Sequence, residues 1–287
     1  MILYPNCKIN LGLRVIGKRA DGYHDLETIF VPVYGLHDEL EVTPSEQFSF
    51  IQEGIAVDCP EEDNLIIRCY RSMAAHYPQI GSVSIRFRKN IPFGAGLGGG
   101  SSDAAHMAIA LNQLFSLGLT TEQLVDEVRP LGADCPFFIY NTPCYAEGIG
   151  DQLTPVDLNL KGLRILLLKP TESVSTREAY SGISLHPEAA GELKTLFTQH
   201  SGPSTFDFRL STIFTNDFEQ TVFPLHPVIA QIKERLLSAG ALYASMSGSG
   251  STVFGLFEDD AEGRTLARLR VLEQEFASMV LLNDSLG

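Results

Sequence analysis

The sequence predicts an α+β protein with two domains, and three observations support this prediction. Strand-forming side chains dominate the opening residues, as in 9–15 and 28–33. A glycine-rich segment then leads into an alanine-rich helix that extends to about Phe115. In the second half, strands and helices alternate. Pro155, Asn159 and Gly162 mark the predicted boundary, which separates 1–155 from 156–287.

The first half begins with two strands joined by a polar turn at 18–24. Further strands are expected at 40–42 and 48–51. A helix is expected after Asp63-Asn64, because apolar residues then recur at helical spacing behind a carboxylate or amide that could cap it. Apolar and polar residues alternate over 83–88, which predicts a half-exposed antiparallel strand. Another helix opens at Thr120.

The second half contains four predicted strands and three predicted helices. A glycine-rich connection, Ser247-Gly-Ser-Gly250, joins the second and third of these strands. The strands are expected at 163–168, 242–246, 252–257 and 279–282, and the helices at 188–198, 227–239 and 261–276.

Composition restricts the possible partners. The 287 residues include 35 acidic and 21 basic side chains, giving a formal charge of −14. This charge would repel nucleic acid and anionic membranes, so neither is expected as a partner. A phosphate ligand must therefore be balanced locally by backbone N–H groups, a helix N-terminus, a metal ion and a few cations.

The cysteines and the N-terminus point to a cytoplasmic protein. The five cysteines form no Cys-x-x-Cys pair and have no histidine spacing suited to zinc. The first residues lack the basic start and apolar run of a secretion signal, and no segment approaches the roughly 18 apolar residues of a membrane span.

The strongest functional signal is the glycine-rich segment from Pro92 to Ser102, here called the glycine loop. Its glycines remove Cβ atoms from the backbone, so an anion can approach several N–H groups. The helix that follows directs its positive end to the same place. The residues predicted to bind a triphosphate are Pro92, Gly94, Gly96, Leu97, Gly98, Gly99, Gly100, Ser101 and Ser102.

Two other phosphate motifs fit this loop poorly. The Gly-Lys-Ser/Thr ending of the P-loop is absent. Gly94-x-Gly96-x-x-Gly99 matches the dinucleotide fingerprint and leaves a nicotinamide dehydrogenase as an alternative. However, the preceding strand alternates in polarity, Pro92 intervenes, and the acid at the right distance, Glu122, lies in a predicted helix.

The glycine loop resembles the second motif of the GHMP kinases, a superfamily of small-molecule kinases. Further segments, in order, resemble the branch that phosphorylates 4-diphosphocytidyl-2-C-methyl-D-erythritol. They are Lys8-Ile-Asn10-Leu, Asp21-Gly-Tyr-His24, the overlapping run from Gly22 to Thr28, Gly132-Ala-Asp134-Cys-Pro-Phe, Asn216-Asp-Phe-Glu219 and Met246-Ser-Gly-Ser-Gly250. The resemblance implies an α+β kinase fold whose N-terminal domain is like domain 2 of ribosomal protein S5 and whose C-terminal domain is ferredoxin-like.

The resemblance also implies catalytic roles. Asp134 would be the base that accepts the hydroxyl proton, and Lys8 would favour the developing alkoxide. Without the resemblance, Asp134 would be interpreted as a helix cap or turn residue and Lys8 as a surface charge. Asn10 would bind the polyol hydroxyls, since it follows Lys8 on the same strand face.

The base of the substrate is assigned to aromatic residues by the same resemblance. Tyr23 would stack on cytosine, His24 would hydrogen-bond its edge, and Tyr180 is the candidate for the opposite face. Asn64 falls where the family contacts adenine, although helix capping explains it equally well. Cys7, where many relatives carry alanine, is expected to serve packing.

The sequence therefore predicts a kinase that uses ATP and Mg²⁺ on a cytidine diphosphate ester of methylerythritol, with no protein ligand assigned to the metal. We expect a monomer or a weak homodimer. Another GHMP kinase, such as one acting on homoserine, is the nearest alternative. A nucleotide-binding regulatory module without catalysis is disfavoured because both Lys8 and Asp134 are present.

Overall fold

A computed structural model describes residues 1–56, 59–200, 214–260 and 262–286. These residues form two compact units, each assembled from separate stretches of the chain. The first unit comprises 1–8, 36–93 and 98–142, and the second comprises 9–35, 94–97 and 143–287. The predicted division at residue 155 follows chain order rather than contacts, and it stays a prediction.

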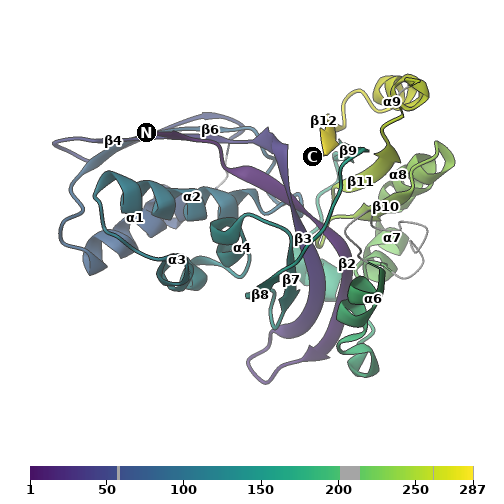
Figure 1. Cartoon of the computed structure of the whole chain (residues 1–287), viewed down its shortest axis with the longest axis horizontal. Coiled ribbons are helices and arrows are strands. Elements are labelled where there is room, and N and C mark those ends of the chain that lie inside the picture. Colours follow the sequence, from purple (N-terminus) through teal and green to yellow (C-terminus); the bar gives the residue numbers. More distant parts are fainter. Residues whose placement is uncertain (57–58, 201–213, 261, 287) are drawn as a thin grey trace. The chain divides into compact units, whose positions relative to one another are not determined.

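A four-stranded sheet and its helices make up the first unit (Figure 1). The sheet order is β1 (Ile2–Leu3), β4 (Glu39–Pro44), β6 (Val83–Lys89) and β5 (Ser49–Gly54). The helices are α1 (Leu65–His76), α2 (Gly99–Leu114), α3 (Thr121–Val128) and α4 (Cys135–Tyr140), with short 3₁₀ turns at Glu61–Asp63 and Arg129–Leu131. Apolar side chains of β4, β6, α1 and α2 share one core.

Strand β6 has the alternating burial that its sequence predicted. Val83, Ile85 and Phe87 are buried, whereas Arg86 and Arg88 are exposed, as the alternation predicted. The expected antiparallel pairing holds only toward β4, because β5 pairs with β6 in parallel. The connection from β5 to β6 passes through α1, which is the usual way to join parallel neighbours.

The second unit contains two four-stranded sheets. One has the order β2 (Asn6–Lys18), β3 (His24–His37), β7 (Cys144–Glu147) and β8 (Gln152–Pro155), with the first residues of β2 and the last of β3 belonging to the first unit. The polar turn predicted at 18–24 separates β2 from β3. Strands β7 and β8 were not predicted.

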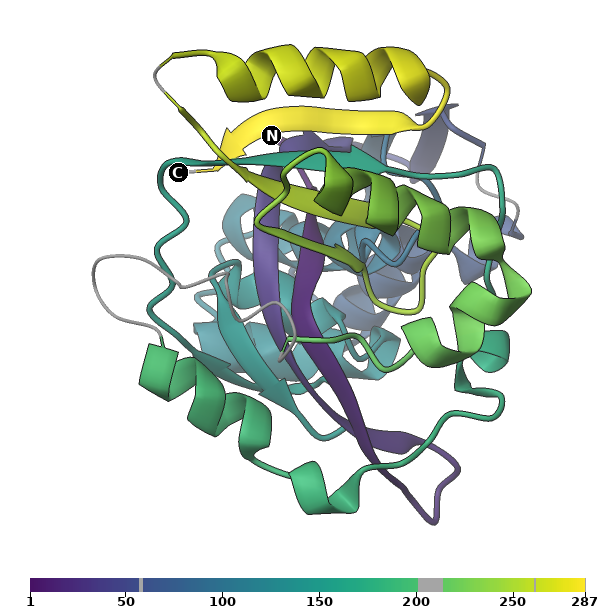
Figure 2. The ribbon, with the colours of Figure 1, turned by 90° about the vertical axis from the view of Figure 1, so that its right-hand side faces the viewer.

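The other sheet has the order β10 (Tyr243–Met246), β11 (Val253–Glu258), β9 (Leu163–Leu168) and β12 (Val280–Leu286), all antiparallel. Helix α8 (Pro227–Ser238) precedes β10, and α9 (Arg264–Glu275) precedes β12. Both helices share an apolar core with β9, and Figure 2 shows α9 alongside β12. This βαββαβ order confirms the predicted ferredoxin-like arrangement.

Some helices differ from the predictions. The helix expected at 188–198 is divided into a 3₁₀ turn, Pro187–Ala189, and α6 (Glu192–His200), because Gly191 has a φ of +78° between them. Helix α9 starts at Arg264, after Gly263, and the predicted start at residue 261 lies outside the described residues. The short helices α4, α5 (Thr176–Tyr180) and α7 (Glu219–Leu225) were not predicted, because they are too short to show a helical period.

No helix within the described ranges combines the length and apolar character needed to cross a bilayer.

Candidate active site

Lys8 and Asp134 form an ion pair in the first unit. Lys8 lies on β2 with only 4% of its surface exposed, and Asp134 immediately precedes α4. Lys8 Nζ lies 3.5 Å from Asp134 Oδ2. The Asp134 side chain makes no capping hydrogen bond to α4 and is about one third exposed. The structure thus brings together the two predicted catalytic residues and gives no support to the helix-cap alternative.

The glycine loop meets this ion pair at Gly98. Gly98 has a φ of +70°, which favours glycine. A Cβ atom there would lie 3.2 Å from Lys8 Cε and 3.0 Å from the Phe138 ring. A side chain at position 98 would therefore crowd the ion pair, and its absence lets the loop lie directly against Lys8.

Helix α2 starts within the predicted loop, at Gly99. Gly99, Gly100 and Ser101 form its first residues, whose N–H groups have no partner inside a helix, whereas Ser102 N donates to Gly98 O. The helix N-terminus adds its positive partial charge at the same place. Backbone N–H groups suited to an anion are therefore present where the sequence predicted them.

The two serines have different surroundings. Ser102 is fully buried, with Oγ 3.4 Å from His106 Nδ1, which lends no support to a direct phosphate contact by its hydroxyl. Ser101 is half-buried and hydrogen-bonds the Cys135 thiol in the turn that carries Asp134. Of the two hydroxyls, only that of Ser101 is partly accessible.

The remaining loop residues, Gly94 to Leu97, belong to the second unit. Gly96 has a φ of +74°, and a Cβ atom there would overlap the carbonyl oxygen of Ser247. Ser247 Oγ also donates to Gly96 O at 2.9 Å. Leu97 is buried, so only its backbone can face a ligand. The Ser247–Gly250 turn thus supports the glycine loop at Gly96.

Asn216 holds this supporting turn in place. Its Nδ2 donates to Met246 O and Gly248 O, each at 2.8 Å, and its Oδ1 accepts from Phe218 N. The sequence identified Asn216 only as part of a family motif and assigned it no role. A buried amide next to a glycine-rich turn is the signal that could have suggested one.

Asn64 caps α1 and lines a hollow. Its Oδ1 accepts from Ile66 N at 2.9 Å, which confirms the capping account. It also borders a hollow of about 240 Å³ in the first unit, together with Phe50, Gln52, Cys59 and Glu61. Pro92, half-buried, begins the glycine loop in the same unit.

The predicted base-binding residues lie in the second unit. Tyr23 is 61% exposed in the turn after β2. Tyr180, the last residue of α5, stacks on His24 with the ring centres 4.4 Å apart and the planes 17° from parallel. Burial lowers the pKa of His24, and the positive charge of Lys18 lowers it further. The structure therefore brings Tyr180 to His24.

Asn10 is buried on β2. Its Nδ2 donates to Thr28 Oγ1 at 2.9 Å, and the Thr28 hydroxyl donates to Gly12 O at 2.6 Å. This chain of hydrogen bonds fixes the orientation of the Asn10 amide.

Cys7, which also lies on β2, is fully buried. Burial raises the pKa of its thiol to about 12, which agrees with the expected packing role.

Comparisons with known proteins agree with this geometry. The family model described as GHMP kinases N terminal domain matches 64–142, and the model described as GHMP kinases C terminal matches 208–269. A 4-diphosphocytidyl-2-C-methyl-D-erythritol kinase of Parabacteroides distasonis is 49% identical over 258 residues, covering 90% of this chain and 92% of the relative. The corresponding kinase of Azobacteroides pseudotrichonymphae is 47% identical over 258 residues, covering 90% and 94%.

The chain belongs to the 4-diphosphocytidyl-2-C-methyl-D-erythritol kinase family, a branch of the GHMP kinases. A crystal structure of 4-(cytidine 5'-diphospho)-2C-methyl-D-erythritol kinase superposes with a TM-score of 0.75 at 30% identity and covers both chains completely. A homoserine kinase from Cytophaga hutchinsonii reaches a TM-score of 0.71 at 16% identity, covering 98% of this chain and 95% of its own, and so shows the shared fold alone.

Membership of the GHMP kinases establishes an enzyme that uses ATP. The nicotinamide dehydrogenase alternative does not fit this family. Among the described residues, no three or more His, Cys, Asp or Glu side chains are grouped so that they could hold a metal ion.

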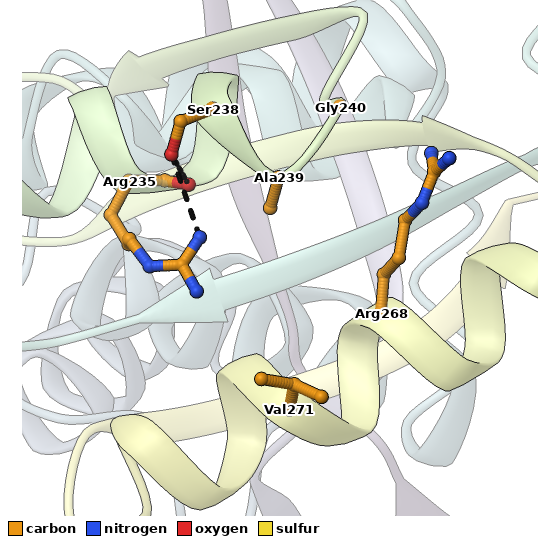
Figure 3. Close-up of a pocket in the computed structure, with 6 residues that line it drawn as sticks. All are labelled: Arg235, Ser238, Ala239, Gly240, Arg268 and Val271. Atoms are coloured by element: carbon orange, nitrogen blue, oxygen red, sulfur yellow. Dashed lines mark hydrogen bonds between the residues drawn. The ribbon is translucent and has the colours of Figure 1, made fainter.

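A further pocket of about 390 Å³ lies between α8 and α9 of this GHMP kinase (Figure 3). Arg235 lies on the wall of this pocket, and its Nε donates to Glu275 Oε1 at 3.0 Å and to Oε2 at 2.9 Å. The pocket is lined by Arg235, Ser238, Ala239, Gly240, Arg268 and Val271. None of the predicted site residues lines it, so it has no part in the site described above.

Proposed function

We propose that this kinase transfers the γ-phosphate of ATP to the 2-hydroxyl of 4-diphosphocytidyl-2-C-methyl-D-erythritol, a step in the non-mevalonate route to isoprenoid precursors. The observation that carries the proposal is the Lys8–Asp134 pair lying against Gly98. A base, a cation and anion-binding N–H groups are the parts that phosphoryl transfer to an alcohol needs. The printed names of the relatives supply the substrate.

In this proposal, Asp134 accepts the proton of the hydroxyl as its oxygen attacks the γ-phosphorus. Lys8 stabilises the alkoxide that develops, because an opposite charge at contact distance favours the ionised form. The N–H groups of Gly99 to Ser101 hold the phosphates and orient the terminal one. Mg²⁺, bound mainly through phosphate oxygens, would neutralise charge on the phosphates.

The hollow beside Asn64 is proposed as the adenine site. Its wall combines an aromatic ring, Phe50, with the polar groups of Gln52 and Asn64, a mixture suited to a purine. Asn64 Oδ1 already serves the helix cap, so an adenine contact would use its amide N–H groups.

The cytosine is proposed to bind at Tyr23, His24 and Tyr180. The 4.4 Å stack of Tyr180 on His24 leaves no room for a base between the two rings. Cytosine would therefore either separate these rings or bind at their edge, with the exposed Tyr23 ring covering its face. Asn10, held by Thr28, would contact the methylerythritol hydroxyls. We also expect the enzyme to work in the cytoplasm.

Phosphorus NMR with a panel of alcohols tests the proposed substrate. Wild-type enzyme, ATP and Mg²⁺ are incubated in parallel with 4-diphosphocytidyl-2-C-methyl-D-erythritol, homoserine and mevalonate. A new phosphomonoester signal should appear with the cytidylyl alcohol, while the other two alcohols remain unphosphorylated. Product from homoserine without product from the cytidylyl alcohol would assign the enzyme to a different GHMP reaction.

A further inference from the structure

Three charged side chains are buried together in the first unit, outside the ion pair of the active site. Lys89 ends β6, Asp38 lies between β3 and β4, and Asp103 lies in the second turn of α2. Only 2%, 0% and 4% of their surfaces are exposed. Lys89 Nζ donates to Asp38 Oδ2 at 2.5 Å and to Asp103 Oδ2 at 2.7 Å. One ammonium therefore joins three separate segments of the chain.

Asp38 also holds the residues that enter the glycine loop. Its Oδ1 accepts from the backbone N–H groups of Asn90 at 2.6 Å and Ile91 at 2.8 Å, immediately before Pro92. The N–H groups that donate to this carboxylate thus come from the entry of the loop and from Lys89.

Asp103 connects the same lysine to the exit of the loop. It follows Gly99, the first residue of α2, by four positions. A Cβ atom on Gly99 would lie 3.0 Å from Lys89 Nζ, so the lysine lies directly beneath the helix N-terminus. The two ends of the glycine loop are therefore tied through a single buried cation.

We propose that Lys89, Asp38 and Asp103 are positioning residues for ATP, which fix both ends of the glycine loop so that its N–H groups stay directed at the phosphates. None of the three needs to touch the nucleotide. The inference rests on the proposed ATP site at Gly98 to Ser101. A displacement of about 1 Å in groups that position a substrate is enough to reduce catalysis strongly. The rigid connection made by Lys89, Asp38 and Asp103, here called the tether, would keep the loop N–H groups from shifting by that much.

The two carboxylates are not equivalent in this tether. Asp38 accepts three hydrogen bonds, whereas Asp103 accepts one from Lys89, and its Oδ1 is buried without a donor. Burial raises the pKa of the Asp103 carboxyl well above its usual range; Lys89 opposes this rise and Asp38 adds to it. Burial by itself would lower the pKa of Lys89, but the two carboxylates outweigh burial and raise it.

This asymmetry predicts opposite results for the two amide substitutions. In Asp103→Asn the amide oxygen can accept from Lys89 while the NH₂ group faces the Asp38 carboxylate, so every group keeps a partner. In Asp38→Asn the NH₂ group must face either Lys89 or two backbone N–H groups, which places donors against donors. Asp103→Ala removes the link to α2 altogether.

Calorimetric titration of the folded variants with ATP and Mg²⁺, without any alcohol, tests the tether. We expect Asp103→Ala and Asp38→Asn to weaken ATP binding by about tenfold, and Asp103→Asn to stay within about twofold of wild type. Arg88→Met is the matched control, since Arg88 is the preceding residue of β6 but forms an exposed pair with Glu53. It should leave ATP affinity unchanged.

A merely structural role would lower the melting temperature of these variants and leave the ATP affinity of the folded protein alone. Equal ATP affinities for Asp103→Ala, Asp103→Asn and wild type would overturn the proposal, even if Asp38→Asn fails to fold. The measurement contains no alcohol, so the ranking of the ATP affinities does not depend on the substrate assignment. If the three residues do not hold the loop in place, the variants should bind ATP as wild type does and the ranking should disappear.

Discussion

Asp134 and Lys8 are the proposed catalytic pair at the scale of single residues. Their side chains lie 3.5 Å apart, and the carboxylate makes no capping hydrogen bond that would explain it structurally. Lys8 is nearly buried and pairs with Asp134. Because both side chains are proposed to act on the hydroxyl rather than to hold ATP, substitutions at this pair should affect the reaction itself more than nucleotide binding.

Asp134→Asn should lower kcat by about a hundredfold or more with little change in KM for ATP, because the amide cannot accept the hydroxyl proton. Steady-state kinetics by ADP release measures both constants. Asp126→Asn, an exposed aspartate of α3 paired with Arg129, is the control and should match wild type. Unchanged kcat in the Asp134 variant would remove this residue from the role of base.

His24 should make substrate binding depend on pH. Burial lowers the pKa of His24 from its usual value, which favours the neutral ring, and a neutral ring offers one donor and one acceptor to cytosine. As the pH falls through this lowered pKa, the ring gains a proton and loses the acceptor. KM for the cytidylyl substrate should therefore rise on the acid side while KM for ATP stays level. Identical pH profiles for the two constants would count against this role.

At the scale of elements, β6 and its flanking segments show what the sequence could predict. Alternation identified the inward face of the strand from Val83, Ile85 and Phe87, and Lys89 falls on that same face by parity. The tether formed by Lys89 also depends on Asp38 and Asp103. These two residues lie far from each other in the sequence, so no local pattern predicts that both contact Lys89. Helix α4 escaped prediction because six residues show no period, although the motif that contains Asp134 was found.

The family motifs, more than local patterns, singled out residues that the fold brings together. Lys8 and Asp134 are 126 positions apart in the sequence, and no spacing rule brings them together. Tyr180 reached its place beside His24 through the packing of α5, where its ring also meets Phe218 edge-on at 4.8 Å. Ser247 and Asn216 gained their supporting roles only once the turn at Ser247–Gly250 was seen against Gly96.

Two glycines of the loop provide a matched pair of substitutions. Gly96→Ala places a methyl group on the Ser247 carbonyl, whereas the same change at Gly94 meets nothing within 4 Å. Both residues have positive φ, so each pays the same conformational cost of about 1 kcal/mol, and only Gly96 adds a clash. Gly96→Ala should therefore raise KM for ATP far more than Gly94→Ala. Equal effects would show that the contact with Ser247 is unimportant for the loop.

At the scale of the whole molecule, the fold indicates the protein family, whereas the net charge restricts the kinds of partner. The fold belongs to the GHMP kinases, and its ferredoxin-like half was predicted from the resemblance rather than from periodicity. The formal charge of −14 disfavours polyanionic partners and leaves phosphate binding to a few backbone and cationic groups. Lys8 beside the glycine loop fits this requirement.

The same charge bears on self-association. A strongly acidic surface opposes the approach of a second copy, so the chain should be a monomer or a weak homodimer. Sedimentation velocity over a range of concentrations, at low and at high salt, measures this directly. Added salt should favour any dimer by screening the repulsion. A stable tetramer at low salt would contradict the prediction.

In the proposed reaction, the glycine loop presents the γ-phosphate to an alcohol activated by Asp134. A crystal structure with a non-hydrolysable ATP analogue, Mg²⁺ and 4-diphosphocytidyl-2-C-methyl-D-erythritol tests this arrangement most directly. The 2-hydroxyl oxygen should lie at about 3 Å from the Asp134 carboxylate and in line with the γ-phosphorus. A ternary complex whose hydroxyl lies beyond the reach of both groups, with the phosphates away from Gly98 to Ser101, would contradict it.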